Sequence, residues 1–301
     1  MLTTSISTRI GHLRTSSPIV KMEIAKLLDL NNDGLNMAVD ENFMYIRCQR
    51  SMYKYNLLNM NRTAQNEIFT KDGKARYLSV CDEYVFLTDF CDLYILDKDS
   101  LQIAEVMRLG EDLSSDLGVT RFNDRKAYIC IRNGKIAIMN INTKEYQKYD
   151  ISDSSYWDFT VNERYLYIGT VQGELLKIDT SNMKTHRITA LGNKNIYSVV
   201  IDDNLIYTVS QDRTIKSTNF ETFKTVCVAK KAVRGMAKIL GLYKDSLFVA
   251  DTNKISVWDK QTLHLMREFI FPTGHFNKGV LLAENKLFGS DYQSVYCAEL
   301  E

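Results

Sequence analysis

The sequence predicts an all-β fold, a β-propeller of seven blades with four antiparallel strands per blade, from three observations. An acidic or amide turn followed by an aromatic-centred strand recurs seven times at a spacing of about 40 residues. Short alternating strand patterns fill each repeat. Only two prolines occur in the chain, as expected of hydrogen-bonded strands. The recurring aromatics are Tyr45, Phe86, Tyr128, Tyr167, Tyr207, Phe248 and Phe288.

Each repeat divides into four strand-like segments, and the fifth repeat shows the division best. Its segments cover residues 196–201, 205–210, 214–219 and 223–229, with turn-forming residues between the first three. In six repeats the third segment leads into an outer strand through a turn that starts at an aspartate or asparagine. These residues are Asn56, Asp97, Asn142, Asp179, Asn219 and Asp259.

The seventh repeat stops one strand short, because the chain ends at Glu301 after three strand-like segments. Residues 19–28, IVKMEIAKLL, precede the first repeat and form a strand pattern without a partner. We expect this N-terminal strand to pair with the last three and close the ring, which removes two exposed sheet edges. Residues 1–18 would then be a flexible tail, and residues 19–301 a single seven-bladed domain.

The composition excludes several classes of function. A net charge of +1 gives no overall field that favours nucleic acid, and no apolar run approaches the roughly 18 residues that span a bilayer. The N-terminus lacks the apolar core of a secretory signal. None of the six cysteines forms a CxxC pair, and no Cys/His spacing fits zinc. We therefore expect reduced, buried thiols, no metal or other cofactor, and a cytoplasmic protein that binds no membrane.

Two phrases late in the chain carry a family resemblance. Residues 256–263, SVWDKQTL, contain the pair Trp258-Asp259, and residues 210–219, SQDRTIKSTN, have the Ser, Asp and Thr-Ile that precede such a pair. Gly274-His275 is similar to the Gly-His that opens a blade. The chain thus resembles a divergent WD40-like propeller. That resemblance implies a rigid platform that binds a protein or peptide on its top face, where the fourth-to-first and second-to-third strand loops meet.

The loops expected on the top face divide by charge. Those entering the third and fourth repeats are acidic, at residues 110–116 and 152–158, whereas those entering the last three carry Lys or Arg. A bipolar surface of this kind orients a charged partner, and Tyr156-Trp157 would supply aromatic anchors. The predicted partner-binding residues are Arg76, Asp116, Tyr156, Trp157, Asp158, Lys230, Lys231, Arg234 and His275.

Other interpretations of these residues stay open. The loop charges could be solvated without a partner, and one of the two aromatics could fill a blade interface. Arg76 and Arg234 could hold a carboxylate or phosphate, or pair with Asp116 and Asp158. By the family resemblance, His275 would be a structural hydrogen-bonding residue.

The leading hypothesis is a non-enzymatic scaffold, because no phosphate-binding loop, zinc-protease motif or nucleophile elbow occurs in the chain. The first alternative is an enzyme with a site at the mouth of the central channel, built from Arg76, Asp116, Asp158, Arg234 and His275. The second is nucleic-acid or phosphoinositide binding through Lys230, Lys231 and Arg234. The sequence leaves the oligomeric state and the identity of the partner undetermined.

Overall fold

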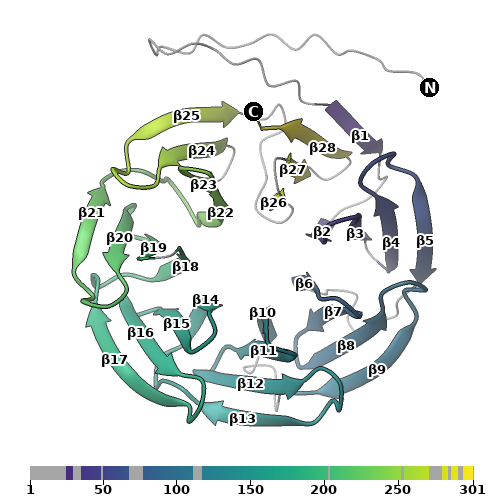
Figure 1. Ribbon diagram of the computed structural model, residues 1–301, viewed down its shortest axis with the longest axis horizontal. Helices are drawn as coiled ribbons and strands as arrows, with labels where there is room; N and C mark the ends of the chain where they lie inside the picture. The colour runs from purple at the N-terminus through teal and green to yellow at the C-terminus, as the bar shows by residue number, and fades with distance from the viewer. Residues whose placement is uncertain are drawn as a thin grey trace.

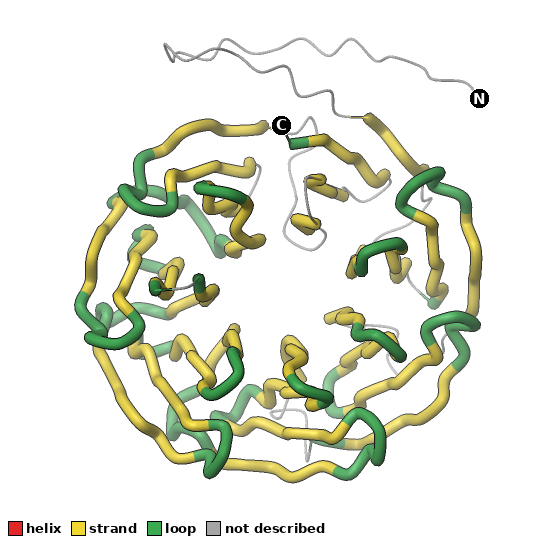
Figure 2. The backbone as a smooth tube through the Cα atoms, viewed as in Figure 1, coloured by secondary structure: helices red, strands yellow, loops and turns green. Residues whose placement is uncertain are grey.

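The computed structural model describes residues 25–29, 35–48, 50–67, 77–110, 117–202, 204–251, 254–270, 280–283, 286–290 and 294–300. These residues form 28 strands, arranged as seven four-stranded sheets. All neighbouring strands within a sheet are antiparallel, for example in the outer pairs of two sheets. Figure 2 shows the strands joined by loops, with no helix among the described residues. The predictions of an all-β propeller and of four antiparallel strands per blade are confirmed.

We number the sheets as blades in chain order. Blade 1 contains β2 (Leu35–Val39), β3 (Phe43–Cys48), β4 (Ser51–Asn56) and β5 (Arg62–Glu67). Blade 2 contains β6 (Tyr77–Val80), β7 (Tyr84–Asp89), β8 (Asp92–Asp97) and β9 (Ile103–Arg108). Blade 3 contains β10 (Leu117–Asn123), β11 (Lys126–Ile131), β12 (Lys135–Asn140) and β13 (Tyr146–Asp150). Blade 4 contains β14 (Tyr156–Val161), β15 (Tyr165–Thr170), β16 (Glu174–Asp179) and β17 (Lys184–Ala190).

The remaining blades follow the same plan. Blade 5 contains β18 (Ile196–Ile201), β19 (Leu205–Ser210), β20 (Ile215–Asn219) and β21 (Thr225–Ala229). Blade 6 contains β22 (Lys238–Tyr243), β23 (Ser246–Asp251), β24 (Lys254–Asp259) and β25 (Leu265–Ile270). Blade 7 contains β26 (Val280–Ala283), β27 (Lys286–Ser290), β28 (Ser294–Glu299) and β1 (Ala25–Asp29). The first strand of each of blades 1 to 6, and β26 in blade 7, lies nearest the axis of the ring (Figure 1).

The N-terminal strand closes the ring. β1 pairs antiparallel with β28, with Ala25 opposite Cys297 and Asp29 opposite Ser294. Figure 1 shows β1 and β28 side by side at the rim of the ring. The predicted closing strand is therefore confirmed at β1, residues 25–29; residues 19–24 of the predicted strand lie outside the described residues. Residues 1–18, predicted to be a tail, lie outside the described residues.

The recurring aromatics pack between blades, as the sequence predicts. All seven are at most 3% exposed. Tyr45 of blade 1 contacts a cluster from blade 2, and Tyr167 of blade 4 contacts a cluster from blade 5. Phe288 of blade 7 packs against blade 1, which completes the circle. Because each blade buries one face against the next, the second strands are almost wholly buried, as in β7 and β15.

A five-residue turn after the third strand recurs in blades 1 to 6. Its first residue accepts a backbone hydrogen bond from the fifth, as Asp97 does from Leu101 and Asp259 from Leu263. The fifth residue has a left-handed backbone, at Met60, Leu101, Lys144, Met183, Phe223 and Leu263. That conformation is unfavourable for a non-glycine residue, and burial of Leu101 and Leu263 helps to offset it. In blade 3 the turn starts at Asn140, whose Oδ1 accepts from Asn142 and Thr143. The prediction of Asn142 was therefore wrong by two residues.

Candidate interaction face

Backbone hydrogen bonds hold the loops of the top face together. In blade 3, the amides of Ile151 and Ser152 in the β13–β14 loop donate to the carbonyl of Gly134 in the β11–β12 turn. In blade 5, Gln211 donates to Asn195. The fourth-to-first and second-to-third strand loops therefore lie on one face, as expected. The other two loop types meet on the opposite face, where Thr180 donates to Arg164.

Two glycines permit this close approach of loops. Gly134 and Gly173 have φ values of +74° and +86°. A Cβ atom on Gly134 would lie 1.9 Å from the carbonyl oxygen of Ser152, and a Cβ atom on Gly173 would lie 2.8 Å from that of Gly192. Glycine is therefore required at both positions for steric as well as conformational reasons. The result is a set of loops whose backbone is fixed before any partner binds.

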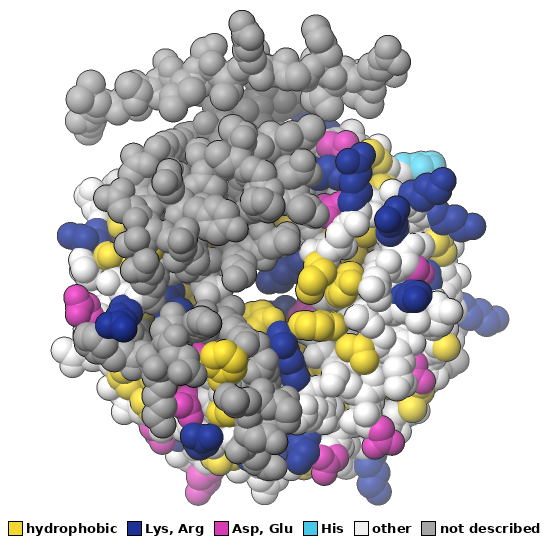
Figure 3. Space-filling model, turned by 180° about the vertical axis from the view of Figure 1, so that it is seen from behind, with side chains coloured by type: hydrophobic (Ala, Val, Ile, Leu, Met, Phe, Trp, Pro, Cys, Tyr) yellow, Lys and Arg dark blue, Asp and Glu magenta, His cyan; other side chains and the backbone are white. Residues whose placement is uncertain are grey.

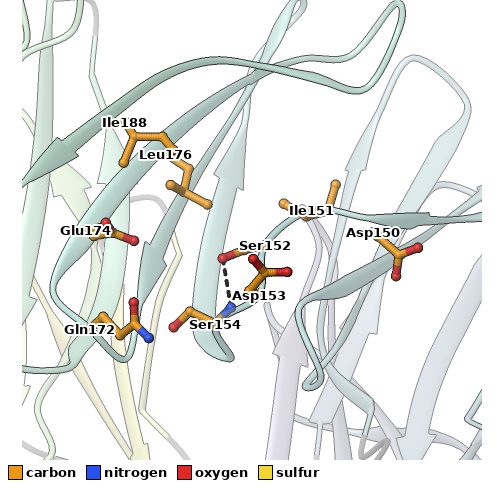
Figure 4. Close-up of a pocket in the computed structure, with 9 residues that line it drawn as sticks. All are labelled: Asp150, Ile151, Ser152, Asp153, Ser154, Gln172, Glu174, Leu176 and Ile188. Atoms are coloured by element: carbon orange, nitrogen blue, oxygen red, sulfur yellow. Dashed lines mark hydrogen bonds between the residues drawn. The ribbon is translucent and has the colours of Figure 1, made fainter.

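A pocket of about 370 Å³ opens between blades 3 and 4 (Figure 4). The β13–β14 loop forms one wall, and β16, β17 and the β15–β16 turn form the other. Leu176 and Ile188 lie together at one end, while Glu174 and Gln172 face the loop. The lining residues are Asp150, Ile151, Ser152, Asp153, Ser154, Gln172, Glu174, Leu176 and Ile188. We call this the acidic pocket.

The acidic pocket combines carboxylates with an apolar wall. Asp150, Asp153 and Glu174 give it negative charge, and the Asp150 carboxylate is 3.8 Å from the ammonium of Lys135. Ile188, an apolar side chain on the outer strand β17, is 57% exposed. Ser152 Oγ accepts a hydrogen bond from the Ser154 amide, which fixes the loop. This chemistry suits a segment that carries both a cation and an aliphatic side chain.

Tyr156 lies in the interior, so the expectation that it is an exposed loop residue was wrong. Its side chain is 1% exposed, and its hydroxyl donates to the carbonyl of Lys135. Burial raises the pKa of Tyr156 well above its usual value, so the phenol is neutral. Its ring meets that of Phe159 edge to face at 6.4 Å. Tyr156 therefore fills the interface between blades 3 and 4.

Trp157 is half-buried and sits at a bulge at the start of β14. The pairing of β14 with β15 shifts between Tyr156 and Asp158, which leaves Trp157 as the extra residue. Its ring lies beneath the guanidinium of Arg132, 4.4 Å from the ring centre, in a cation–π contact. Its Nε1 is buried and makes no hydrogen bond to any residue that the structure describes. Trp157 is therefore held rigidly, with part of its surface reachable by a partner.

Asp158 is a structural junction between three blades. Its Oδ1 accepts from Arg121 Nη2 of blade 3 at 2.9 Å, and its Oδ2 accepts from Ser198 Oγ of blade 5 at 2.7 Å. The amides of Phe159 and Val199 also donate to this carboxylate. Asp158 is 4% exposed. It cannot offer free surface to a macromolecular partner, so its prediction as a contact residue was wrong.

The basic loop before β22 is also held in place. Asp251 is buried and accepts hydrogen bonds from the backbone amides of Arg234 and Gly235, at 2.6 and 3.1 Å. Lys230, Lys231 and Arg234 are all exposed. We call residues 230–236, which include the 56%-exposed Met236, the basic loop. It lies in a fourth-to-first strand connection, and hence on the same face as the acidic pocket.

Three predicted residues, Arg76, Asp116 and His275, lie outside the described residues. Sequence reasoning missed Arg121, which binds Asp158, and Arg132, which covers the ring of Trp157. No local motif marks them, because their position depends on strand register and on the curvature of the ring.

In the described ranges, no group of three or more His, Cys, Asp or Glu residues could hold a metal ion. No helix there is long and apolar enough to cross a membrane. None of the six cysteines is in a disulfide, and three of them are buried.

Comparisons with known proteins support the fold. The family model of the LVIVD repeat matches residues 153–186. No curated protein matches the chain in sequence. A chain of the mitotic checkpoint complex superposes with a TM-score of 0.77 and 13% identity, covering 98% of this chain and 100% of that one. The WD40 domain of Neurospora crassa Pan2 superposes with a TM-score of 0.71 and 12% identity, covering 90% of this chain and 89% of that one. BamB from Moraxella catarrhalis superposes with a TM-score of 0.66 and 13% identity, covering 97% of this chain and 99% of that one. At these identities the likeness shows the β-propeller fold alone.

Proposed function

We propose that this protein is a non-enzymatic, cytoplasmic scaffold of the seven-bladed WD40 type that binds a protein or peptide on its top face. The observation that carries the proposal is a rigid top face with one acidic and one basic region. The acidic pocket and the basic loop both belong to loops fixed by backbone hydrogen bonds. Complementary charge at two separate points sets the orientation of a partner as well as its association rate.

Rigidity supports binding because a preformed surface loses little conformational entropy on association. The bonds to Gly134 and Asp251 fix both charged regions before a partner arrives. Trp157 adds an aromatic side chain already held by Arg132. The partner that fits this face is a segment with a basic, aliphatic part for the acidic pocket and an acidic part for the basic loop.

The experiment begins with affinity capture from the source cells and identification of the retained protein. Its affinity is then measured by calorimetry for the wild type and for two variants. Trp157→Ala should weaken binding by at least about 2 kcal/mol, as expected of an aromatic anchor. The double variant Lys230→Glu/Lys231→Glu should mainly slow association, with an effect that shrinks as salt rises.

The matched control is Lys126→Glu, an exposed residue at the start of β11, on the opposite face. The control should bind like the wild type. A loss of binding in Lys126→Glu, with none in Trp157→Ala, would show that the partner binds the opposite face and would contradict the proposal. Turnover of a small molecule that disappears in Arg234→Ala would overturn the scaffold assignment and favour the channel-mouth enzyme.

A further inference from the structure

The junction between blades 4 and 5 encloses a lysine of this chain. Lys216 of β20 pairs with Val228 of the outer strand β21. Its ammonium donates to the carbonyl of Leu191, in the β17–β18 loop, and lies 3.5 Å from the carboxylate of Asp212. The side chain of Lys216 is only 12% exposed. A loop carbonyl and a carboxylate therefore hold an ammonium between these two blades.

The acidic pocket occupies the corresponding position one blade earlier. Leu176 pairs with Ile188 as Lys216 pairs with Val228. Both Leu176 and Lys216 also stand three residues before the residue that starts the five-residue turn of their blade. Leu176 thus takes the place of the lysine, and the pocket of about 370 Å³ opens where Leu176 and Ile188 meet the loop.

The loops at the two junctions correspond as well. The amide of Ile151 donates to the carbonyl of Gly134, as the amide of Leu191 donates to that of Gly173. The carbonyl that matches the acceptor of the internal lysine therefore belongs to Ile151, which lines the acidic pocket. The two junctions share their backbone arrangement and differ in the side chain that fills it.

The acidic pocket has carboxylates where the next blade supplies a cation. Asp150 lies 3.8 Å from the ammonium of Lys135. Asp153 and Glu174 form no ion pair with any residue that the structure describes. Figure 4 shows Glu174 facing the loop that carries Asp153, with the two apolar side chains at one end of the pocket. The pocket thus offers charge and an apolar wall to a cation from outside the chain.

The wider surface does not favour a cation in the same way. The net charge of the chain is +1, and Figure 3, a view from behind, shows acidic and basic side chains interspersed among the described residues. Recognition of a cation therefore depends on contacts inside the pocket rather than on a broad field of one sign.

We propose that the acidic pocket binds the side chain of a lysine of the partner protein, in the arrangement that Lys216 shows one blade later. Its ammonium donates to the carbonyl of Ile151 and to the carboxylates of Asp153 and Glu174, while its aliphatic stem lies along the apolar wall. An ammonium is a compact point charge with three donors, unlike the planar guanidinium of arginine. This assignment rests on the proposed docking function of the top face, which it narrows to one type of side chain.

The test uses three short capped peptides, acetyl-Gly-Leu-Lys-Gly-amide and its counterparts with arginine or norleucine in place of lysine. Binding to the full chain, isotope-labelled, is measured from amide chemical shifts. The lysine peptide should shift the amides of Ser154 and Glu174 saturably, with a dissociation constant of about 1 mM. The arginine peptide should bind at least about 3-fold more weakly, and the norleucine peptide should cause no shift.

Two variants of blade 4 separate the pocket from the rest of the surface. Leu176→Lys gives the pocket an ammonium of its own, as Lys216 does at the next junction, and should abolish binding of the lysine peptide. Leu176→Met adds no charge and should bind like the wild type. Glu174→Gln should weaken binding at least about 5-fold by removing a carboxylate. Its matched control is Asp212→Asn at the junction of blades 4 and 5, which should leave binding unchanged.

Thermal melting establishes that each variant is folded, and Glu174→Gln decides the matter if Leu176→Lys is not. The proposal is overturned if the lysine peptide does not bind the wild type, if the norleucine peptide binds equally well, or if a folded Leu176→Lys or Glu174→Gln binds like the wild type. A captured partner that is weakened by Trp157→Ala but not by Leu176→Lys would overturn the lysine assignment and leave the docking function standing. Failure of the docking function is recognised separately, by partner binding that is lost in Lys126→Glu and kept in Trp157→Ala.

Discussion

Replacement of Asp158 by asparagine tests the junction between blades 3, 4 and 5. Asparagine keeps the shape of the side chain, but its NH₂ group cannot accept a hydrogen bond. The NH₂ group would face either the donors from Ser198 and Val199 on one side or Arg121 on the other. The substitution also removes the charge that balances the guanidinium of Arg121.

The expected loss of stability follows from these contacts. A hydrogen bond to a charged group contributes about 1.5 to 3 kcal/mol, and an unsatisfied buried donor costs about 1 to 3 kcal/mol. Arg121 is one-third exposed, so solvent replaces part of its lost ion pair. We therefore expect Asp158→Asn to lower the free energy of unfolding by about 3 kcal/mol, a large share of the typical total.

The assay is equilibrium unfolding in urea, followed by tryptophan fluorescence and circular dichroism. The midpoint should fall while the dependence on urea stays unchanged. Asp153→Asn is the matched control, since Asp153 is exposed on the loop just before β14. It should change stability by no more than about 0.5 kcal/mol. Equal stability of Asp158→Asn and the wild type would refute the role of Asp158 as a junction.

Three further predictions concern the blades. Tyr167→Ala should cost about 3 to 5 kcal/mol in urea unfolding, because the fully buried ring packs against blade 5; a cost below about 1 kcal/mol would contradict this packing. Deletion of residues 1–29 should lower the melting temperature sharply by removing β1 from β28, whereas deletion of residues 1–16 should change it little; equal effects would reject closure by β1. Burial raises the pKa of Asp40, but hydrogen bonds from Lys98, Tyr45 and two amides outweigh this and lower it. Asp40 therefore stabilises the fold above about pH 4, and that stability is lost as the pH falls through its folded pKa. Asp40→Asn should be less stable than the wild type at pH 6, and the difference should shrink as the pH is lowered.

The periodic features of the fold were predictable because each blade repeats the same local physics. The aromatic of the second strand, such as Tyr167, must be buried in each copy, so its spacing is visible in the sequence. The missing last strand likewise implied β1, since an unpaired edge needs a partner. The exact position of one turn failed, at Asn140, where two asparagines lie two residues apart.

The candidate site was less predictable, because it depends on how strands face one another. The bulge at Trp157 turns Tyr156 into the blade interface and Asp158 toward blades 3 and 5. A polar loop pattern cannot reveal that shift in register. The acidic pocket also arises only where two blades meet.

The central claim is that a partner binds the top face through the acidic pocket. It is tested most directly by the affinity of the captured partner for two variants of blade 4 with the same change of charge. Glu174→Lys places a cation in the acidic pocket, whereas Glu163→Lys places one in an exposed turn on the opposite face. The account predicts that Glu174→Lys weakens binding at least 10-fold and that Glu163→Lys leaves it unchanged. Equal affinity of the two variants, or a loss confined to Glu163→Lys, would contradict it.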